Sequence, residues 1–179
     1  MKKTVRFLLA FLTAFALMMV VRVVGITIYT INGTSLEPSF QAGDRVMVNR
    51  WSYGLRVGGK DSFFDYGRIA RQSIEKGDLI AFENPQNSEQ ILICRCTGLP
   101  GDSIIHEGQK LIVPSLKDCA DTDYYWLESI SPDDKVDSHV LGFIAEEHII
   151  GRAFMVVYSR NPSEPLWRGW RMDRLILPL

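Results

Sequence analysis

An apolar run near the N-terminus constrains the fold of this chain more than any other feature of its sequence. Residues 7–21 contain no charged side chain, three basic residues come before them, and Arg22 interrupts the run before it continues. A helix needs about 20 residues to cross the hydrocarbon core of a membrane, and an arginine near its end can extend to the headgroups. The run therefore predicts a transmembrane helix within residues 1–25, with its basic end in the cytoplasm.

A cleaved secretory signal is the alternative interpretation, because it also joins a basic start to an apolar stretch. The run is long for such a signal, and the small-x-small sequence at residues 14–16 lies in its middle. We therefore expect an uncleaved, single-pass anchor. In either case residues 26–179 form a domain outside the cytoplasm.

Short segments rich in β-branched and aromatic residues follow the apolar run, and Gly, Pro, Asn and Asp residues separate them. No long segment with helical periodicity lies between them. We expect a mostly β protein, in which the N-terminal transmembrane helix precedes an antiparallel, barrel-like β domain. The formal net charge of −1 gives no general attraction to nucleic acid. The predicted strands are residues 26–31, 45–51, 78–85, 90–97, 110–114, 148–159 and 174–179.

Two of the three cysteines, Cys94 and Cys96, lie two residues apart on one predicted strand. Such residues share a face of the strand but are poorly placed to bridge each other. Cys119 is therefore the expected partner of one of them if a disulfide forms. Neither a second cysteine pair nor a nearby histidine pair accompanies them, so we expect no bound metal and no cofactor.

The turn after the first predicted strand holds the first candidate for chemistry. Ser35 follows that strand closely, between Gly33 and Pro38. A serine at a strand end can present its hydroxyl to a cleft, where backbone N–H groups of the turn can stabilise an oxyanion. A serine in an ordinary turn has the same local sequence, so the surrounding motifs have to distinguish the two.

Four segments of the chain carry motif-like sequences, and they cover most of it from about residue 26 onward. In chain order they are GTSLEPSFQAGDRVMVNRWSYG, KGDLIAFENP, CRCTGLPGD and DSHVLGFIAEEHIIGRAFMVVYS. Their order and spacing resemble the four sequence blocks of type I signal peptidases. The resemblance implies a membrane-anchored peptidase whose serine is activated by a desolvated, neutral lysine.

The resemblance also implies roles for individual residues. Ser35 matches the nucleophile, and Tyr29, Ile31, Leu36 and Ile93 match positions that line two shallow apolar pockets. The implied substrate is the signal peptide of an exported preprotein, cut after a small-x-small motif at the surface of membrane lipid. It would bind as an added strand along residues 26–31 and 90–94.

The third block departs from the family at the residue that the chemistry needs. Alignment on residues 98–102 puts Cys94 where the catalytic lysine should stand. In the fourth block Lys135 replaces a serine that helps to hold this lysine, and His139 replaces an arginine. The Asp-Ser pair at residues 137–138 is kept.

Three hypotheses for the missing lysine stay open. Lys135 could act as a relocated base, although its acidic neighbours favour the ammonium form. The protein could instead be an inactive paralogue that binds peptides at the membrane, which the loss of the family's Gly-Asp-Asn at residues 129–131 also favours. Cys94 could react itself, although Arg95 points to the opposite face of a strand and gives its thiolate little help. Of the three histidines, only His139 stands in place of a motif residue, the family's arginine, and it is a further candidate base.

Overall fold

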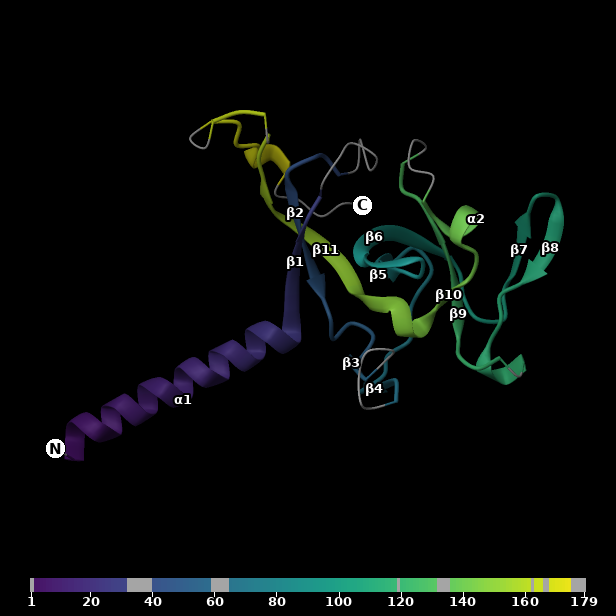
Figure 1. The fold of residues 1–179 in the computed structure, drawn as a ribbon. Coiled ribbons are helices and arrows are strands. Elements are labelled where there is room, and N and C mark those ends of the chain that lie inside the picture. Colours follow the sequence, from purple (N-terminus) through teal and green to yellow (C-terminus); the bar gives the residue numbers. More distant parts are fainter. Residues whose placement is uncertain are drawn as a thin grey trace.

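The computed structural model describes residues 2–31, 40–58, 65–118, 120–131, 136–161, 163–165 and 168–174. Helix α1 (Lys2–Gly25) covers the apolar run, as the sequence predicts, and extends away from the β domain (Figure 1). Among the described residues, no helix has both the length and the apolar character needed to cross a membrane. The large apolar side chains of α1 that are exposed are Val5, Phe7, Leu8, Leu9, Phe11, Leu12, Phe15, Leu17 and Met18.

Seven strands form one sheet in the order β1-β2-β11-β5-β6-β9-β10, and every pairing in it is antiparallel. The prediction of a mostly β, antiparallel domain is therefore confirmed. The strands are β1 (Ile26–Thr30), β2 (Asp44–Asn49), β5 (Leu79–Asn84), β6 (Asn87–Gly98), β9 (Tyr124–Glu128), β10 (Ile144–Ala145) and β11 (Ile149–Ser159).

The described strands do not close into a barrel, so the barrel-like prediction is wrong in this respect. β1 lies at one edge of the sheet and the two-residue β10 at the other, without pairing to each other. Two register shifts between β11 and β2 mark irregular positions that bend a strand and increase its twist. The sheet is therefore curved but open.

Two hairpins and four short helical segments complete the described fold. The hairpins are β3 (Leu55–Val57) with β4 (Gly67–Ile69), and β7 (Ser103–His106) with β8 (Gln109–Ile112). The short helices are η1 (Leu116–Asp118), α2 (Ser138–Leu141), η2 (Glu146–His148) and η3 (Met172–Arg174). Six of the seven predicted strands coincide with observed ones, whereas residues 175–179 of the seventh lie outside the described part of the chain.

The core consists of two apolar clusters, one on each face of the sheet. The first contains Ile31, Phe40 and Ile93, and the second contains Cys94 and Cys96. Since successive side chains of a strand point to opposite faces, β6 supplies both clusters. This alternation separates Ile93 from Cys94, although they are neighbours in sequence.

A polar network around the buried Asp78 carboxylate joins three of the motif segments. The Tyr53 hydroxyl donates to Asp78 Oδ2 at 2.8 Å, and Arg152 Nη2 lies 3.1 Å from Asp78 Oδ1. Beside Arg152, a Cβ on Gly151 would lie 2.2 Å from the Asn49 carbonyl oxygen, so β11 requires glycine where it crosses β2. These motif residues therefore hold the strands together.

Candidate functional site

Three of the residues that match the pocket-lining positions lie in one apolar cluster. Ile31 and Ile93 are buried in the first core cluster, and Tyr29 packs against it half-buried. Tyr29 comes from β1 and Ile93 from β6, which are not neighbours in the sheet, so the curvature of the sheet brings them together. Burial raises the pKa of the Tyr29 hydroxyl, so this side chain is neutral at neutral pH.

The remaining predicted site residues have no described position. Ser35 and Leu36 fall in residues 32–39, and Lys135 falls in residues 132–135, all of which lie outside the described part of the chain. The same holds for Cys119. Their roles stay predictions from the sequence, and the structure contributes the framework on either side of them.

The two ends of the serine-bearing segment are held together by backbone hydrogen bonds. The Ile31 N–H donates to the Asp44 carbonyl at 2.8 Å, and the Gly43 N–H donates to the Ile31 carbonyl at 3.0 Å. Gly43 adopts a positive φ of 91°, a conformation that glycine accepts without strain. Ile31 thus places one end of the segment directly on the apolar cluster.

The carboxylate of Asp44 is fully buried at this point and collects several donors. Ser159 Oγ donates to its Oδ1 at 2.5 Å, and the Gln41 N–H donates to its Oδ2 at 2.9 Å. Arg174 Nη2 lies 3.1 Å from Oδ2, which compensates the buried charge. A residue near the C-terminus therefore stabilises the turn that follows the serine-bearing segment.

Arg171 adds a second link from the same C-terminal segment. Its Nη2 donates to the Ala42 carbonyl at 2.8 Å, and its Nη1 donates to the Gln41 side chain. Sequence reasoning missed both arginines, because nothing in the sequence connects them with a turn 130 residues earlier. Only the tertiary fold brings them together.

Cys94, at the position of the family's lysine, lies in the second core cluster with 1% of its surface exposed. It pairs in register with Ile80 of β5, and its neighbour on the same face is Cys96. Burial, followed by the nearby charges of Asp78 and Asp102, raises the pKa of the Cys96 thiol to about 12. Cys96 is a free, protonated thiol, so no bridge joins the two cysteines.

The kept Asp-Ser pair of the fourth block fixes both ends of the segment that contains Lys135. Asp137 accepts hydrogen bonds from the Ser129 N–H at 3.0 Å and from the His139 N–H at 2.9 Å. Ser138 Oγ accepts from the Leu127 N–H at 2.9 Å. Because Asp137 is the N-cap of α2, one carboxylate closes the segment and starts the helix.

His139 contacts a second histidine that the sequence did not connect with it. His139 Nδ1 lies 3.2 Å from His106 Nδ1, and both rings pack against the indole of Trp126. His148, the third histidine, lies 3.8 Å from a Glu147 carboxylate oxygen. The pairing of His106 with His139 had no signal in the sequence, since 33 residues separate them.

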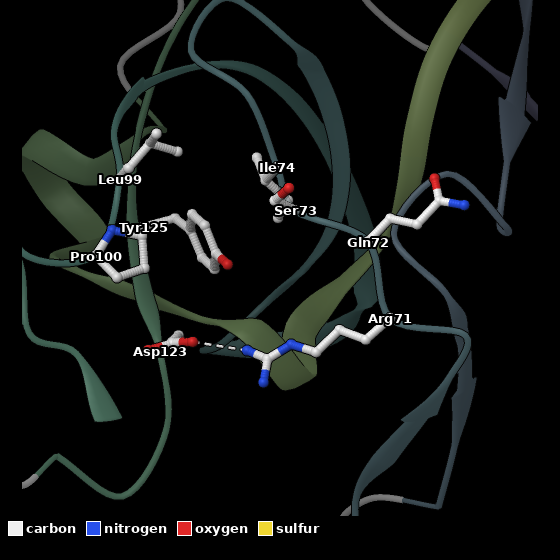
Figure 2. A pocket seen from close by; sticks show the side chains of 8 residues that line it. All are labelled: Arg71, Gln72, Ser73, Ile74, Leu99, Pro100, Asp123 and Tyr125. Atoms are coloured by element: carbon white, nitrogen blue, oxygen red, sulfur yellow. Dashed lines mark hydrogen bonds and ion pairs between the residues drawn. The ribbon is translucent and has the colours of Figure 1, made fainter. Parts of the chain in front are cut away.

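A pocket of about 460 Å³ lies elsewhere, between residues 71–74, Leu99 with Pro100, and the start of β9 (Figure 2). Its charged wall is Arg71, whose Nη2 lies 2.6 Å from Asp123 Oδ2 and 2.7 Å from Glu146 Oε2. Burial raises the pKa of Glu146, and the arginines beside it only partly offset this effect. The pocket adjoins the first residues of β9, whereas the segment that contains Lys135 follows the end of this strand.

The motif segments that these networks join are the ones whose sequences resemble those of type I signal peptidases. The family model described as "Signal peptidase, peptidase S26" matches residues 4–125, which is more than half of the chain. The chain belongs to this family of peptidases.

Individual relatives agree with this assignment. The chain is 28% identical over 123 residues to "Signal peptidase I V" of Bacillus subtilis, covering 69% of this chain and 60% of that protein. It is also 28% identical over 116 residues to "Signal peptidase IB" of Staphylococcus aureus, covering 65% of this chain and 51% of that protein. The chain thus spans between about half and three fifths of the length of these relatives.

Proposed function

We propose that the protein is a membrane-anchored serine endopeptidase that removes signal peptides from exported preproteins after small-x-small motifs. One observation carries this proposal beyond family membership. Tyr29 packs, half-buried, on the apolar cluster that contains the buried Ile31 and Ile93, and Ile31 lies where the segment with Ser35 begins. An apolar environment of this kind suits small apolar side chains just before the cleaved bond.

The proposed reaction is acyl transfer to Ser35. Its Oγ attacks the carbonyl carbon of the scissile bond, while its proton passes to the neutral amine of Lys135. The ammonium formed in this step then protonates the leaving amino group as the peptide bond breaks, and water hydrolyses the remaining ester. Asp137 and Ser138 support this role by holding the segment of Lys135 at both ends.

The substrate binds as an additional strand beside β1. Among the described strands β1 is an edge of the main sheet, so one side of its backbone is available for pairing. Its side chains alternate between exposed and partly buried positions, as expected for a strand with one face on the core. Tyr29 lies on the side that packs on the core.

Helix α1 anchors the protein in membrane lipid. Its exposed apolar side chains have no domain surface to cover them, and lipid is the solvent that favours them. Residues 1–25 then form a cytoplasmic stub and anchor. Residues 26–179 form the domain outside the cytoplasm. The three basic residues at the start support this orientation.

An inactive, peptide-binding paralogue is the second candidate, and the burial of Cys94 favours it. With 1% of its surface exposed among apolar neighbours, Cys94 fits a packing role as a small apolar residue. A chain that keeps the edge strand β1 for peptide binding but lacks a base would bind signal peptides and leave them intact.

A cleavage assay distinguishes the two candidates. The full chain in detergent is incubated with a preprotein that carries an Ala-x-Ala site, over a range of pH. The endopeptidase predicts cleavage that Ser35→Ala abolishes, with Ser39→Ala as the matched control from the same segment. If the protein binds the preprotein without cutting it at any pH, the paralogue is correct.

Two further variants identify the base. Lys135→Arg keeps the positive charge but removes the capacity to accept a proton, so it abolishes cleavage if Lys135 is the base; unchanged activity excludes that role. Cys94→Lys restores the family's residue in an apolar site, where desolvation would lower the pKa of the new amine. Activity should then appear or rise relative to Cys94→Ala, which removes the thiol without adding an amine.

A further inference from the structure

The contact between His106 and His139 joins two elements that are distant in sequence. His106 ends strand β7 of the β7–β8 hairpin, and His139 lies in α2. Their Nδ1 atoms are 3.2 Å apart, with ring centroids at 5.3 Å. This hairpin lies at the margin of the domain, next to α2 and β9 (Figure 1).

The packing around the two rings limits how they can turn. Trp126 contacts both imidazoles with its centroid 5.4 Å from each, and Phe143 supports the indole from another direction at 5.5 Å. Edge and tilted aromatic contacts of this kind favour particular ring orientations. Packing against Trp126 therefore holds the two rings so that their Nδ1 atoms face each other.

A carboxylate stands behind His139 on the side away from this contact. Glu128 Oε1 accepts a hydrogen bond from Trp126 Nε1 at 3.1 Å and lies 3.8 Å from His139 Nε2. A carboxylate at the far nitrogen of a histidine is the usual outer partner of a metal-binding imidazole, because it fixes the tautomer and raises the basicity of the other nitrogen. At 3.8 Å Glu128 lies beyond hydrogen-bond distance of His139 Nε2 and near enough to act as an outer charge.

The separation of the two nitrogens suits a shared metal ion. Two imidazole nitrogens that bind one tetrahedral zinc ion at about 2.0–2.1 Å lie roughly 3.3–3.4 Å apart. The observed Nδ1 to Nδ1 distance is 3.2 Å. Without a metal, one Nδ1 donates its proton to the other. When a divalent ion binds, the donating ring carries that proton on Nε2 instead, so both Nδ1 lone pairs are available to the ion.

We propose that His106 and His139 form a binding site for a divalent transition-metal ion of the imidazole-preferring class, such as Zn²⁺. Within the described residues, no group of three or more His, Cys, Asp and Glu side chains is arranged to hold a metal ion. The site therefore uses two protein ligands, and water completes the coordination, since 48% of the His139 side chain is exposed. The sequence-based expectation of no metal considered only histidines close in sequence, which this pair is not.

Metal binding at this site fastens the β7–β8 hairpin to α2. The N-cap of α2 is Asp137, which also closes the segment after β9 through the Ser129 N–H. An ion that binds only the folded protein stabilises it in proportion to its concentration. The site thus connects metal availability with the rigidity of the fourth motif segment.

The test uses the full chain in detergent, without a polyhistidine tag and after treatment with a chelator. We expect calorimetric titration with ZnCl₂ to give saturable binding of one ion per chain and a rise in melting temperature. His106→Phe and His139→Phe keep an aromatic ring against Trp126 but remove the nitrogens, so each should abolish this binding. His148→Phe is the matched control and should leave it intact.

Two further measurements separate ligation from a general effect on folding. Glu128→Gln removes the outer carboxylate and should weaken zinc binding about tenfold. With Cu²⁺ as the probe, electron paramagnetic resonance should show coupling to two nitrogens in the wild type, and His106→Phe should lose this signature. If the wild type does not bind zinc saturably, or if His106→Phe binds it equally well, the two histidines share only a hydrogen bond and the proposal is wrong.

Discussion

Asp44 shows how a single buried carboxylate can organise a segment that it does not belong to. It lies after the serine-bearing residues, yet its oxygens collect donors from Gln41, Ser159 and Arg174. A buried carboxylate is stable only when such partners compensate the loss of water. The residue therefore connects the turn before β2 with the end of β11 and the C-terminal segment.

Replacing Asp44 by Asn should test this role. The neutral amide cannot compensate the charge of Arg174, and its NH₂ group would face hydrogen-bond donors. The free energy of unfolding should therefore fall by about 2–3 kcal/mol. Chemical denaturation measures the change. Asp173→Ala is the matched control, because Asp173 is exposed in η3 and should change stability by less than about 0.5 kcal/mol. Equal effects of the two substitutions would contradict the assignment.

The Cys96 thiol should make the protein sensitive to alkali. Its pKa is raised to about 12 by burial, then by Asp78 and Asp102, whereas an unfolded thiol ionises near pH 8.5. Between these values the unfolded chain loses a proton that the folded chain keeps, so stability falls as the pH rises, by up to about 1.4 kcal/mol per pH unit. Below this range the contribution is constant.

Urea unfolding from pH 8 to pH 11 measures this slope, with Cys96→Ala as the comparison. The variant starts less stable because it leaves a cavity, but its decline with pH should be shallower. Buried tyrosines such as Tyr53 and Tyr125, whose pKa values are also raised, contribute equally to both proteins. Parallel curves would show that Cys96 does not titrate as described.

At the scale of elements, the segment between β9 and α2 depends on its closing hydrogen bonds. Asp137→Ala removes the acceptor for the N–H groups of Ser129 and His139, which should cost about 1–2 kcal/mol. Amide hydrogen exchange at these two residues should accelerate, because their protection rests on this carboxylate. If Lys135 is the base, cleavage should fall further than the loss of folded protein explains.

A second aspartate in a short helix provides the control for this prediction. Asp118 accepts a hydrogen bond from Ser115 Oγ at 2.9 Å in η1, at an exposed position. Asp118→Ala should leave both cleavage and the exchange of residues 129 and 139 unchanged. If Asp137→Ala behaves in the same way, the cap does not position the segment.

The strands that the sequence predicted are those whose residue types match their place in the sheet. β1, β5, β6 and β11 carry β-branched runs bounded by turn residues, and they lie where expected. β9 (Tyr124–Glu128) was not predicted although it begins with three aromatic residues that favour strands, because Asp121 and Asp123 precede it and it contains no β-branched residue. Its strand conformation comes from pairing with β6, which no local pattern reveals.

For the candidate site, the sequence predicted the residues that share a motif and missed those that share only space. Tyr29, Ile31 and Ile93 share one apolar cluster, and their role in lining substrate pockets stays a prediction. The links from Arg171 and Arg174, and the contact of His106 with His139, join residues that are far apart in the chain. Such contacts depend on the curvature of the whole sheet, so a single sequence cannot supply them.

At the scale of the whole molecule, helix α1 and the C-terminal segment lie at opposite ends of the β1–β2 pair. α1 leads directly into β1, and residues 168–174 return to the turn before β2 (Figure 1). The edge strand proposed to bind substrate therefore begins where the proposed anchor ends. On the proposed function, a substrate paired with β1 would therefore lie beside the end of α1.

The same arrangement predicts that membrane association depends on α1 alone and not on apolar residues of the domain. Leu12 lies near the middle of α1 and is 55% exposed. A lysine at the centre of a membrane-spanning helix costs about 3 kcal/mol relative to leucine, which corresponds to a loss of roughly 100-fold in partitioning. Leu12→Lys should therefore shift the protein out of lipid vesicles in a flotation assay. The matched control is Leu116→Lys, an exposed leucine of η1 at 48%, which should float like the wild type. If the two substitutions act alike, the surface of the β domain contributes to lipid binding, and α1 is not the only element responsible for membrane association.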